Sequence, residues 1–107
     1  MEKVEIFYKE EVENFINDLV FMLYKEGYFS YLENAIEYKD KIIDFIENNI
    51  VDFPHKKTPF ELSHFGSKYM FYKSNSRTTW YIFFEKFDNK YLVSFITNNH
   101  SDNAKFL

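Results

Sequence analysis

The sequence contains no cysteine, only two glycines and two prolines, and no long apolar run. Without cysteine, neither a disulfide nor a thiolate metal site can form. No apolar stretch approaches the roughly 20 residues needed to span a bilayer. The N-terminus also lacks the basic start and apolar core of a signal peptide. We therefore expect a soluble cytoplasmic protein with no membrane partner.

The shortage of glycine and the spacing of histidines limit the possible sites. Gly66 is the only glycine of the second half, so a glycine-rich loop that cradles phosphate is excluded. His55 and His64 lie nine residues apart, with no carboxylate at helical spacing to complete a metal site. No arrangement of serine and aspartate suggests a hydrolase triad. The sequence predicts neither a metal nor a cofactor.

Aromatic residues are abundant. They make up 22% of the 107 residues and include 14 Phe and 9 Tyr. With 46% hydrophobic residues, the chain can bury a modest core. We expect residues 1–107 to form a single domain.

Charge is divided unevenly between the two halves. Residues 1–53 carry 13 acids and 5 lysines, a net charge of −8, whereas residues 54–107 carry 8 basic groups and 4 acids, a net charge of +4. A basic face can meet phosphate even when the whole chain is acidic. Solvated acidic helix faces explain the first half equally well, so both interpretations stay open.

The first half has the pattern of a short strand followed by two helices. Residues 4–8 alternate weakly, and from Glu10 the apolar residues recur at helical spacing. Gly27 suits the left-handed position that ends a helix, and Ser30 with Glu33 reads as a capping box for the next one. The connection is short, so the helices should form an antiparallel hairpin.

The second half is predicted to form an antiparallel sheet. Residues 69–73, 77–86 and 90–98 are rich in β-branched and aromatic side chains. Residues 60–65 are either one more strand or a loop packed on the helical hairpin. The fold class is thus α+β, with a short N-terminal strand and an antiparallel helical hairpin packed on a C-terminal antiparallel sheet.

Two turns set the predicted strand register. A two-residue turn at Asp88-Asn89 pairs Phe83 with Ser94, Tyr81 with Ile96, and Arg77 with His100. A three-residue turn over 74–76 pairs Lys73 with Arg77, Phe71 with Thr79, and Tyr69 with Tyr81. Alternation then gives one apolar face for the helices, formed by Met70, Trp80, Ile82, Phe84, Val93 and Phe95, and places Tyr72 on that side too. The other face holds Lys73, Arg77 and His100 in one row, with Phe71, Thr79 and Asn98 behind it, then Tyr69, Tyr81 and Ile96, and Glu85 and Ser94 further along.

A cationic row beside aromatic rings suits single-stranded RNA. Phosphates bind Lys and Arg, and unstacked bases bind aromatic platforms. Cleavage by the ribose 2′-OH requires a base, an acid, and positive charge around the phosphorane. His100 is the best acid or base of the row, and Arg77 and Lys73 would hold the phosphate. The alternative interpretation assigns no site to these residues. His100 would then be an ordinary surface histidine, and Lys73 and Arg77 would be solvated charges beside a turn. Tyr69 and Tyr81 would belong to a second small core.

The chain resembles the RelE/ParE superfamily of type II toxin–antitoxin toxins over nearly its whole length. The most specific stretches are 65–73, 77–85 and 91–100, which read Phe-Gly-Ser-Lys-Tyr-Met-Phe-Tyr-Lys, Arg-Thr-Thr-Trp-Tyr-Ile-Phe-Phe-Glu and Tyr-Leu-Val-Ser-Phe-Ile-Thr-Asn-Asn-His. They are similar to the family's basic segment, central strand and last strand. The resemblance implies His100 as acid or base, Arg77 and Lys73 as phosphate ligands, and Lys68 and Tyr72 as weaker candidates. The chain departs from the pattern in being acidic overall and in having Ser101 where a tyrosine is usual.

A RelE-like subgroup member would be a metal-independent mRNA endoribonuclease. It would act on mRNA at the ribosome, with Lys68, Tyr69 and Tyr81 in RNA binding, and a cognate antitoxin would wrap it. A ParE-like member would instead inhibit DNA gyrase, and a non-catalytic domain for protein interaction is the third reading.

Overall fold

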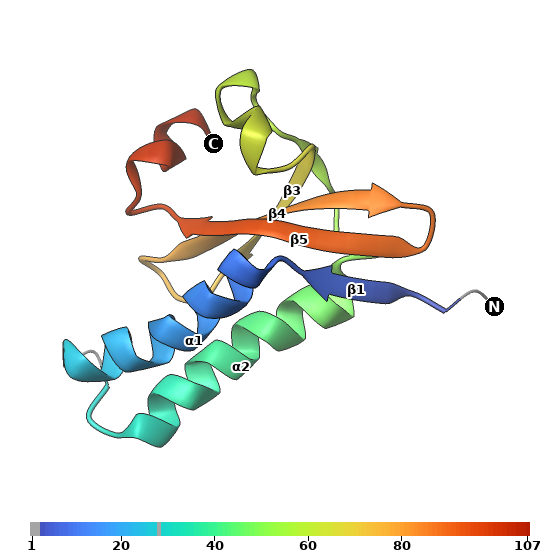
Figure 1. The fold of residues 1–107 in the computed structure, drawn as a ribbon. Helices are drawn as coiled ribbons and strands as arrows, with labels where there is room; N and C mark the ends of the chain where they lie inside the picture. Colours follow the sequence, from blue (N-terminus) through green and yellow to red (C-terminus); the bar gives the residue numbers. More distant parts are fainter. Residues whose placement is uncertain (1–2, 28) are drawn as a thin grey trace.

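Two helices cover one face of a five-stranded sheet (Figure 1). The computed structural model describes residues 3–27 and 29–107. The elements in chain order are β1 (Glu5–Tyr8), α1 (Glu10–Lys25), α2 (Leu32–Asn49), β2 (Lys56–Lys57), the 3₁₀ helix η1 (Phe60–Phe65), β3 (Lys68–Lys73), β4 (Thr79–Phe87), β5 (Lys90–Asn98) and the 3₁₀ helix η2 (Asp102–Phe106). The predicted α+β class, with strand, helices and sheet in that order, is confirmed.

The sheet is mixed, so the prediction of a purely antiparallel sheet is wrong. Its strand order is β1-β5-β4-β3-β2. β1 pairs with β5 in parallel, whereas β2 to β5 pair antiparallel. The whole chain between β1 and β5 provides the long connection that parallel neighbours require.

The helical hairpin differs from its prediction at one end. Glu10, Glu11 and Glu13 occupy the first turn of α1, where the helix dipole favours anions. Gly27 has φ +81°, which confirms its left-handed position. The capping box is wrong, because α2 begins at Leu32 after Tyr31, which forms no side-chain cap. Within the described residues, no helix is long and apolar enough to cross a membrane.

The main core lies between the helices and the sheet. From the sheet, it contains the predicted Met70, Trp80, Ile82, Phe84 and Val93, joined by Tyr91 and Ile96. Tyr72 packs at the margin of this core, stacked on Phe45 of α2 with ring centroids 4.7 Å apart, so its predicted side is confirmed.

A β-bulge in β5 explains why the side chains that follow Ser94 lie on the opposite face from the predicted one. The pairing of β4 with β5 shifts by one residue between Phe83 and Phe84, leaving Ser94 as the extra residue. Beyond it, Phe83 pairs with Phe95 and Ile82 with Ile96, so the predicted pairs of Phe83 with Ser94 and Tyr81 with Ile96 are wrong. A one-residue shift reverses every later side chain. Phe95 therefore leaves the main core and Ile96 enters it. Asn98 pairs with Trp80 and lies on the helix-covered face, so its predicted place beside Phe71 and Thr79 is wrong.

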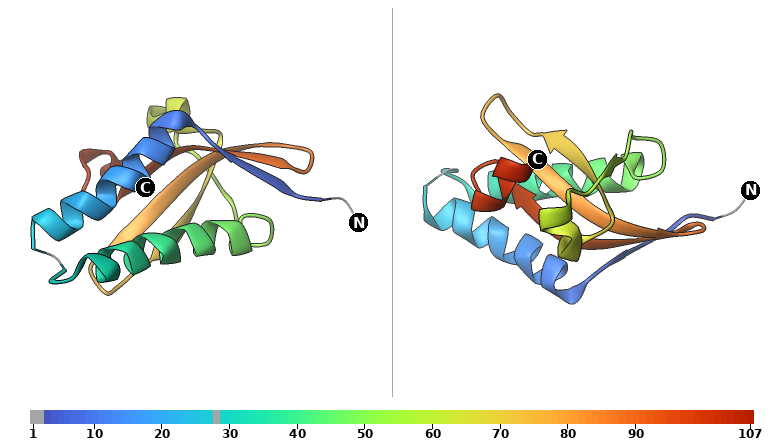
Figure 2. Two further views of the ribbon diagram at one scale, coloured as in Figure 1. Left: turned by 60° about the horizontal axis from the view of Figure 1, so that its bottom comes forward. Right: turned by 90° about the horizontal axis from the view of Figure 1, so that it is seen from above.

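The outer face, meaning the sheet face away from α1 and α2, carries a second small core. Its buried residues are Leu62, Tyr69 and Phe83, with Phe65, Tyr81, Phe95 and Leu107 packed around them. Phe65 stacks on Phe95 with ring centroids 3.8 Å apart. Figure 2 shows η1 and η2 on this side of the sheet, opposite the two long helices. Residues 60–65 are thus neither a strand nor a loop on the helical hairpin.

Candidate nucleic-acid interface

The turn between β3 and β4 is longer than predicted. Lys73 pairs with Thr79, Phe71 with Tyr81, and Tyr69 with Phe83. The predicted partners of Lys73, Phe71 and Tyr69 are therefore wrong by two residues, although an even shift keeps each side chain on its face.

Asn75 accounts for the extra length of this turn. Its Oδ1 accepts hydrogen bonds from the backbone N–H groups of Arg77, at 2.8 Å, and Thr78, at 3.0 Å. This Asx-type turn competes with further strand pairing. The N–H of Ser74 donates to the Thr78 carbonyl at 3.0 Å and closes the loop. Arg77 consequently lies in the loop and does not pair with Lys73.

Arg77 and His100 lie at the same end of the sheet and are held there by hydrogen bonds, although they are not cross-strand partners. The Asn99 side chain donates to the Arg77 carbonyl at 3.0 Å and accepts from the Thr79 N–H at 2.9 Å. The Nε2 of His100 lies 3.3 Å from Thr78 Oγ1. Both candidate side chains are exposed beside the start of β4. The predicted row is thus replaced by a cluster around the loop.

A hollow of about 300 Å³ lies on the outer face of β3 and β4. Lys56 and Lys73 are exposed at its rim. Its other lining residues are Tyr69, Phe71, Thr79, Tyr81 and Leu107. The ammonium of Lys56 lies 5.2 Å from the centroid of the Phe71 ring, within cation–π range. Two positive groups and several aromatic rings therefore share one concave surface.

The two tyrosines of the hollow differ in exposure. Tyr69 is 7% exposed and belongs to the second core, whereas Tyr81 is half-buried. Burial, with a smaller effect of the neighbouring Tyr81, raises the pKa of Tyr69. Its phenol stays neutral at physiological pH. Tyr81 and Phe71 are half-buried, so part of each ring is accessible, and Tyr69 packs edge-on against Tyr81 with ring centroids 6.1 Å apart.

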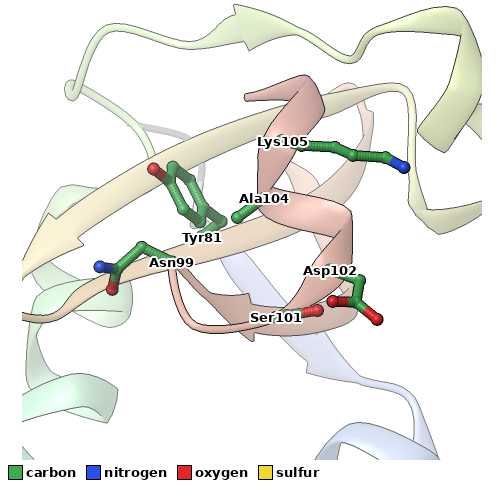
Figure 3. Close-up of a pocket in the computed structure, with 6 residues that line it drawn as sticks. All are labelled: Tyr81, Asn99, Ser101, Asp102, Ala104 and Lys105. Carbon is green, nitrogen blue, oxygen red and sulfur yellow. The ribbon is translucent and has the colours of Figure 1, made fainter.

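A second hollow of about 530 Å³ adjoins the first at Tyr81. It is lined by Tyr81, Asn99, Ser101, Asp102, Ala104 and Lys105. In Figure 3, the side chain of Ala104 faces the Tyr81 ring, whereas the charged ends of Asp102 and Lys105 point away from it. Since the Asn99 side chain already bonds to β4 and the loop, its polar groups are engaged. This hollow extends the accessible surface beside Tyr81.

The structure brings together some of the predicted site residues and separates others. Lys73, Tyr69 and Tyr81 line the first hollow. Arg77 and His100 line neither hollow and lie at the adjacent sheet end. Lys68 pairs with Phe84, which places it on the helix-covered face.

Lys56 and Phe71 also line the first hollow, although the sequence did not single them out as binding residues. Lys56 pairs with Tyr69 through β2, a strand too short to be detected from the sequence. The alternation of β3 already placed Phe71 on the same face as Lys73. Phe71 could have been identified as a candidate from this pattern. Among residues 3–27 and 29–107, no three His, Asp or Glu side chains gather as a metal site would require.

The chain matches no protein-family model, no curated protein and no solved structure. Function must therefore be argued from the geometry of the outer face.

Proposed function

We propose that this chain is a RelE-type toxin that binds single-stranded mRNA on its outer face and cleaves it. The observation that carries the proposal is the hollow in which Lys56 and Lys73 flank Phe71 and Tyr81. Lysines attract the phosphates, and aromatic rings accept unstacked bases of any sequence. The order of strand, helical hairpin and sheet also supports the resemblance to RelE-like toxins.

Cleavage is assigned to the neighbouring sheet end. A base removes the proton of the ribose 2′-OH, whose oxygen attacks phosphorus and forms a 2′,3′-cyclic phosphate. The departing 5′ oxygen takes a proton from an acid. His100 is exposed, and an imidazole can both donate and accept a proton, so it serves as acid or base. Arg77 stabilises the charge on the phosphorane.

The RNA path follows from this arrangement. Thr79 lines the hollow, and its backbone is bonded to Asn99, which precedes His100. A strand seated on Phe71 and Tyr81 thus passes Thr79 before reaching Arg77 and His100. A partner antitoxin would neutralise the toxin, and the ribosome would present the mRNA.

Induced expression tests the proposal. We expect growth arrest with new mRNA 5′ ends, and loss of both in His100→Ala and Arg77→Ala variants. His64→Ala is the matched control, because His64 is an exposed histidine on η1. Each variant is checked for an unchanged circular dichroism spectrum.

The other outcomes separate the alternatives. Arrest with intact mRNA and an SOS response would point to a ParE-type gyrase inhibitor. Absence of arrest would point to a domain for protein interaction. Cleavage that survives His100→Ala would overturn the assignment of the acid or base.

A further inference from the structure

β1 leaves one edge of the sheet open. It is the first strand in the order β1-β5-β4-β3-β2, and no other described strand pairs with its second side. Both views in Figure 2 show it at the margin of the sheet, followed directly by α1. The N–H groups of Glu5 and Lys9 donate to Asn89 and Val93, each at 3.0 Å. Since alternate residues bond to the same neighbour, the backbone groups of Ile6 and Tyr8 point away from β5.

The side chains of β1 alternate between the two faces of the sheet. Ile6 and Tyr8 pack against the main core, so Phe7 lies on the opposite side. Phe7 pairs with Leu92 of β5 and is 50% exposed. Glu5 and Lys9 share its face at equal distances along the strand, and Glu5 also lies 4.0 Å from Lys90 of β5. The open edge thus carries an apolar centre between opposite charges.

This charge pattern complements itself. When two copies of β1 run antiparallel with Phe7 opposite Phe7, Glu5 of each copy faces Lys9 of the other. The same register places Ile6 opposite Tyr8, so the outward backbone groups meet as hydrogen-bonded pairs. A shift of two residues toward the N-terminus would set Lys3 against Lys9, and like charges directly opposite are unfavourable. A shift in the other direction would extend the pairing into α1.

We propose that β1 is a dimerisation edge whose occupant is the β1 strand of a second copy of this chain. The twofold axis passes between the two Phe7 residues, perpendicular to the sheet. Two five-stranded sheets then continue as one, with both outer faces on the same side. The proposal does not depend on RNA binding. Because the edge is short, the dimer is weak, with a dissociation constant of roughly 10–100 µM.

Sedimentation velocity of the full chain without RNA tests this, from about 10 µM to about 1 mM. We expect a rise from monomer to dimer across this range. Glu5→Lys sets lysines against Lys9 at both ends of the interface and should weaken the dimer about tenfold or more. Lys9→Glu leaves the pair of Glu5 with Lys90 intact and should weaken the dimer similarly. Glu5→Lys also sets a lysine opposite Lys90 of the same chain, and the double variant shares this cost, so the double variant should dimerise more tightly than Glu5→Lys alone. Glu33→Lys on the exposed surface of α2 is the control for a change in net charge.

Amide exchange of the unaltered protein provides a second test that needs no variant. The N–H groups of Ile6 and Tyr8 should exchange more slowly as concentration rises. The Lys9 N–H, already bonded to Val93, should change little. A monomer throughout the range would overturn the proposal. So would a dimer that Lys9→Glu leaves intact, or a double variant that dimerises no more tightly than Glu5→Lys alone.

Discussion

At the scale of single residues, two tyrosine hydroxyls have contrasting surroundings. The Tyr38 hydroxyl accepts from Trp80 Nε1 at 2.9 Å and lies 2.9 Å from Ser74 Oγ. This network ties α2 to the loop between β3 and β4. The Tyr8 hydroxyl is buried near the Glu47 carboxylate, but it forms no hydrogen bond of ordinary geometry. Replacement by phenylalanine should therefore have different consequences at the two positions.

Tyr38→Phe should destabilise the protein by about 1–3 kcal/mol. Trp80 is only 2% exposed, so its indole N–H would lose its partner without gaining water. Urea denaturation measures the loss, with Tyr31→Phe as the control because Tyr31 is 64% exposed. Equal stability of the Tyr38 and Tyr31 variants would contradict the role of the network.

Tyr8→Phe should change the free energy of unfolding by no more than about 1 kcal/mol, because the hydroxyl that it removes forms no hydrogen bond of ordinary geometry. Burial, and then the nearby Glu47 carboxylate, raise the pKa of Tyr8 above its usual 10.0. Above pH 10 the unfolded tyrosine ionises while the folded one stays neutral, so the free energy of unfolding falls as pH rises. Denaturation between pH 8 and pH 11 should show a shallower fall in the variant. An identical fall would contradict this account.

At the scale of secondary-structure elements, the bulge in β5 depends on close packing by the segment before β3. A Cβ on Gly66 would lie 2.6 Å from Ser94 Oγ and 3.0 Å from the Phe84 backbone nitrogen. Ser94 Oγ in turn donates to the Phe65 carbonyl. The bulged residue is thus held by the chain that crosses the outer face.

Gly66→Ala should destabilise the protein by about 1–3 kcal/mol through this overlap. Part of the cost should disappear in a Ser94→Ala background, because the nearest atom is then absent. Gly27→Ala is the comparison, since its φ of +81° is strained but nothing lies within 4 Å of the added Cβ. Its cost should be the same with or without Ser94. Thermal or urea denaturation of Gly66→Ala and Gly27→Ala, each with and without Ser94→Ala, measures these costs. The references are the unaltered protein and Ser94→Ala alone.

Some features of the strands and turns could be predicted from the sequence, and others could not. Hydrophobic alternation and the turn at Asp88, which has φ +54°, predicted the strands and the register next to that turn. The bulge at Ser94 depends on a hydrogen bond to Phe65, a residue 29 positions away, so local alternation cannot reveal it. The Asn75 turn similarly lengthened a loop that alternation alone would have kept short. Lys73, Tyr69 and Tyr81 could be grouped from the sequence because the two-residue error preserved their face.

At the scale of the whole molecule, the proposed RNA surface is small and carries few charges. Lys56 and Lys73 are the cations that line the first hollow. For single-stranded nucleic acid, each neutralised phosphate contributes about −0.7 to the slope of log K against log salt concentration. The two lysines of the hollow should therefore contribute roughly −1.4 to the slope, and a contact to Arg77 would add to this.

Lys73→Ala should reduce the magnitude of that slope by about 0.7 and weaken binding to all RNA sequences alike. Fluorescence anisotropy with a labelled uridine-rich oligonucleotide at several salt concentrations measures both effects. Lys41→Ala is the control, because Lys41 lies on α2 and is 3.7 Å from Glu37. A slope that does not change in the Lys73 variant would place the RNA elsewhere.

The extra residue at Ser94 also bears on how this chain would be matched to distant relatives. A relative without the bulge would present each later residue of its last strand one position earlier. If the two sequences were aligned without a gap, Phe95 and Ile96 would each be set against residues from the opposite face. A one-residue gap at position 94 brings inward positions back into correspondence with inward positions. His100 would then be aligned with the residue that follows the last strand of the relative.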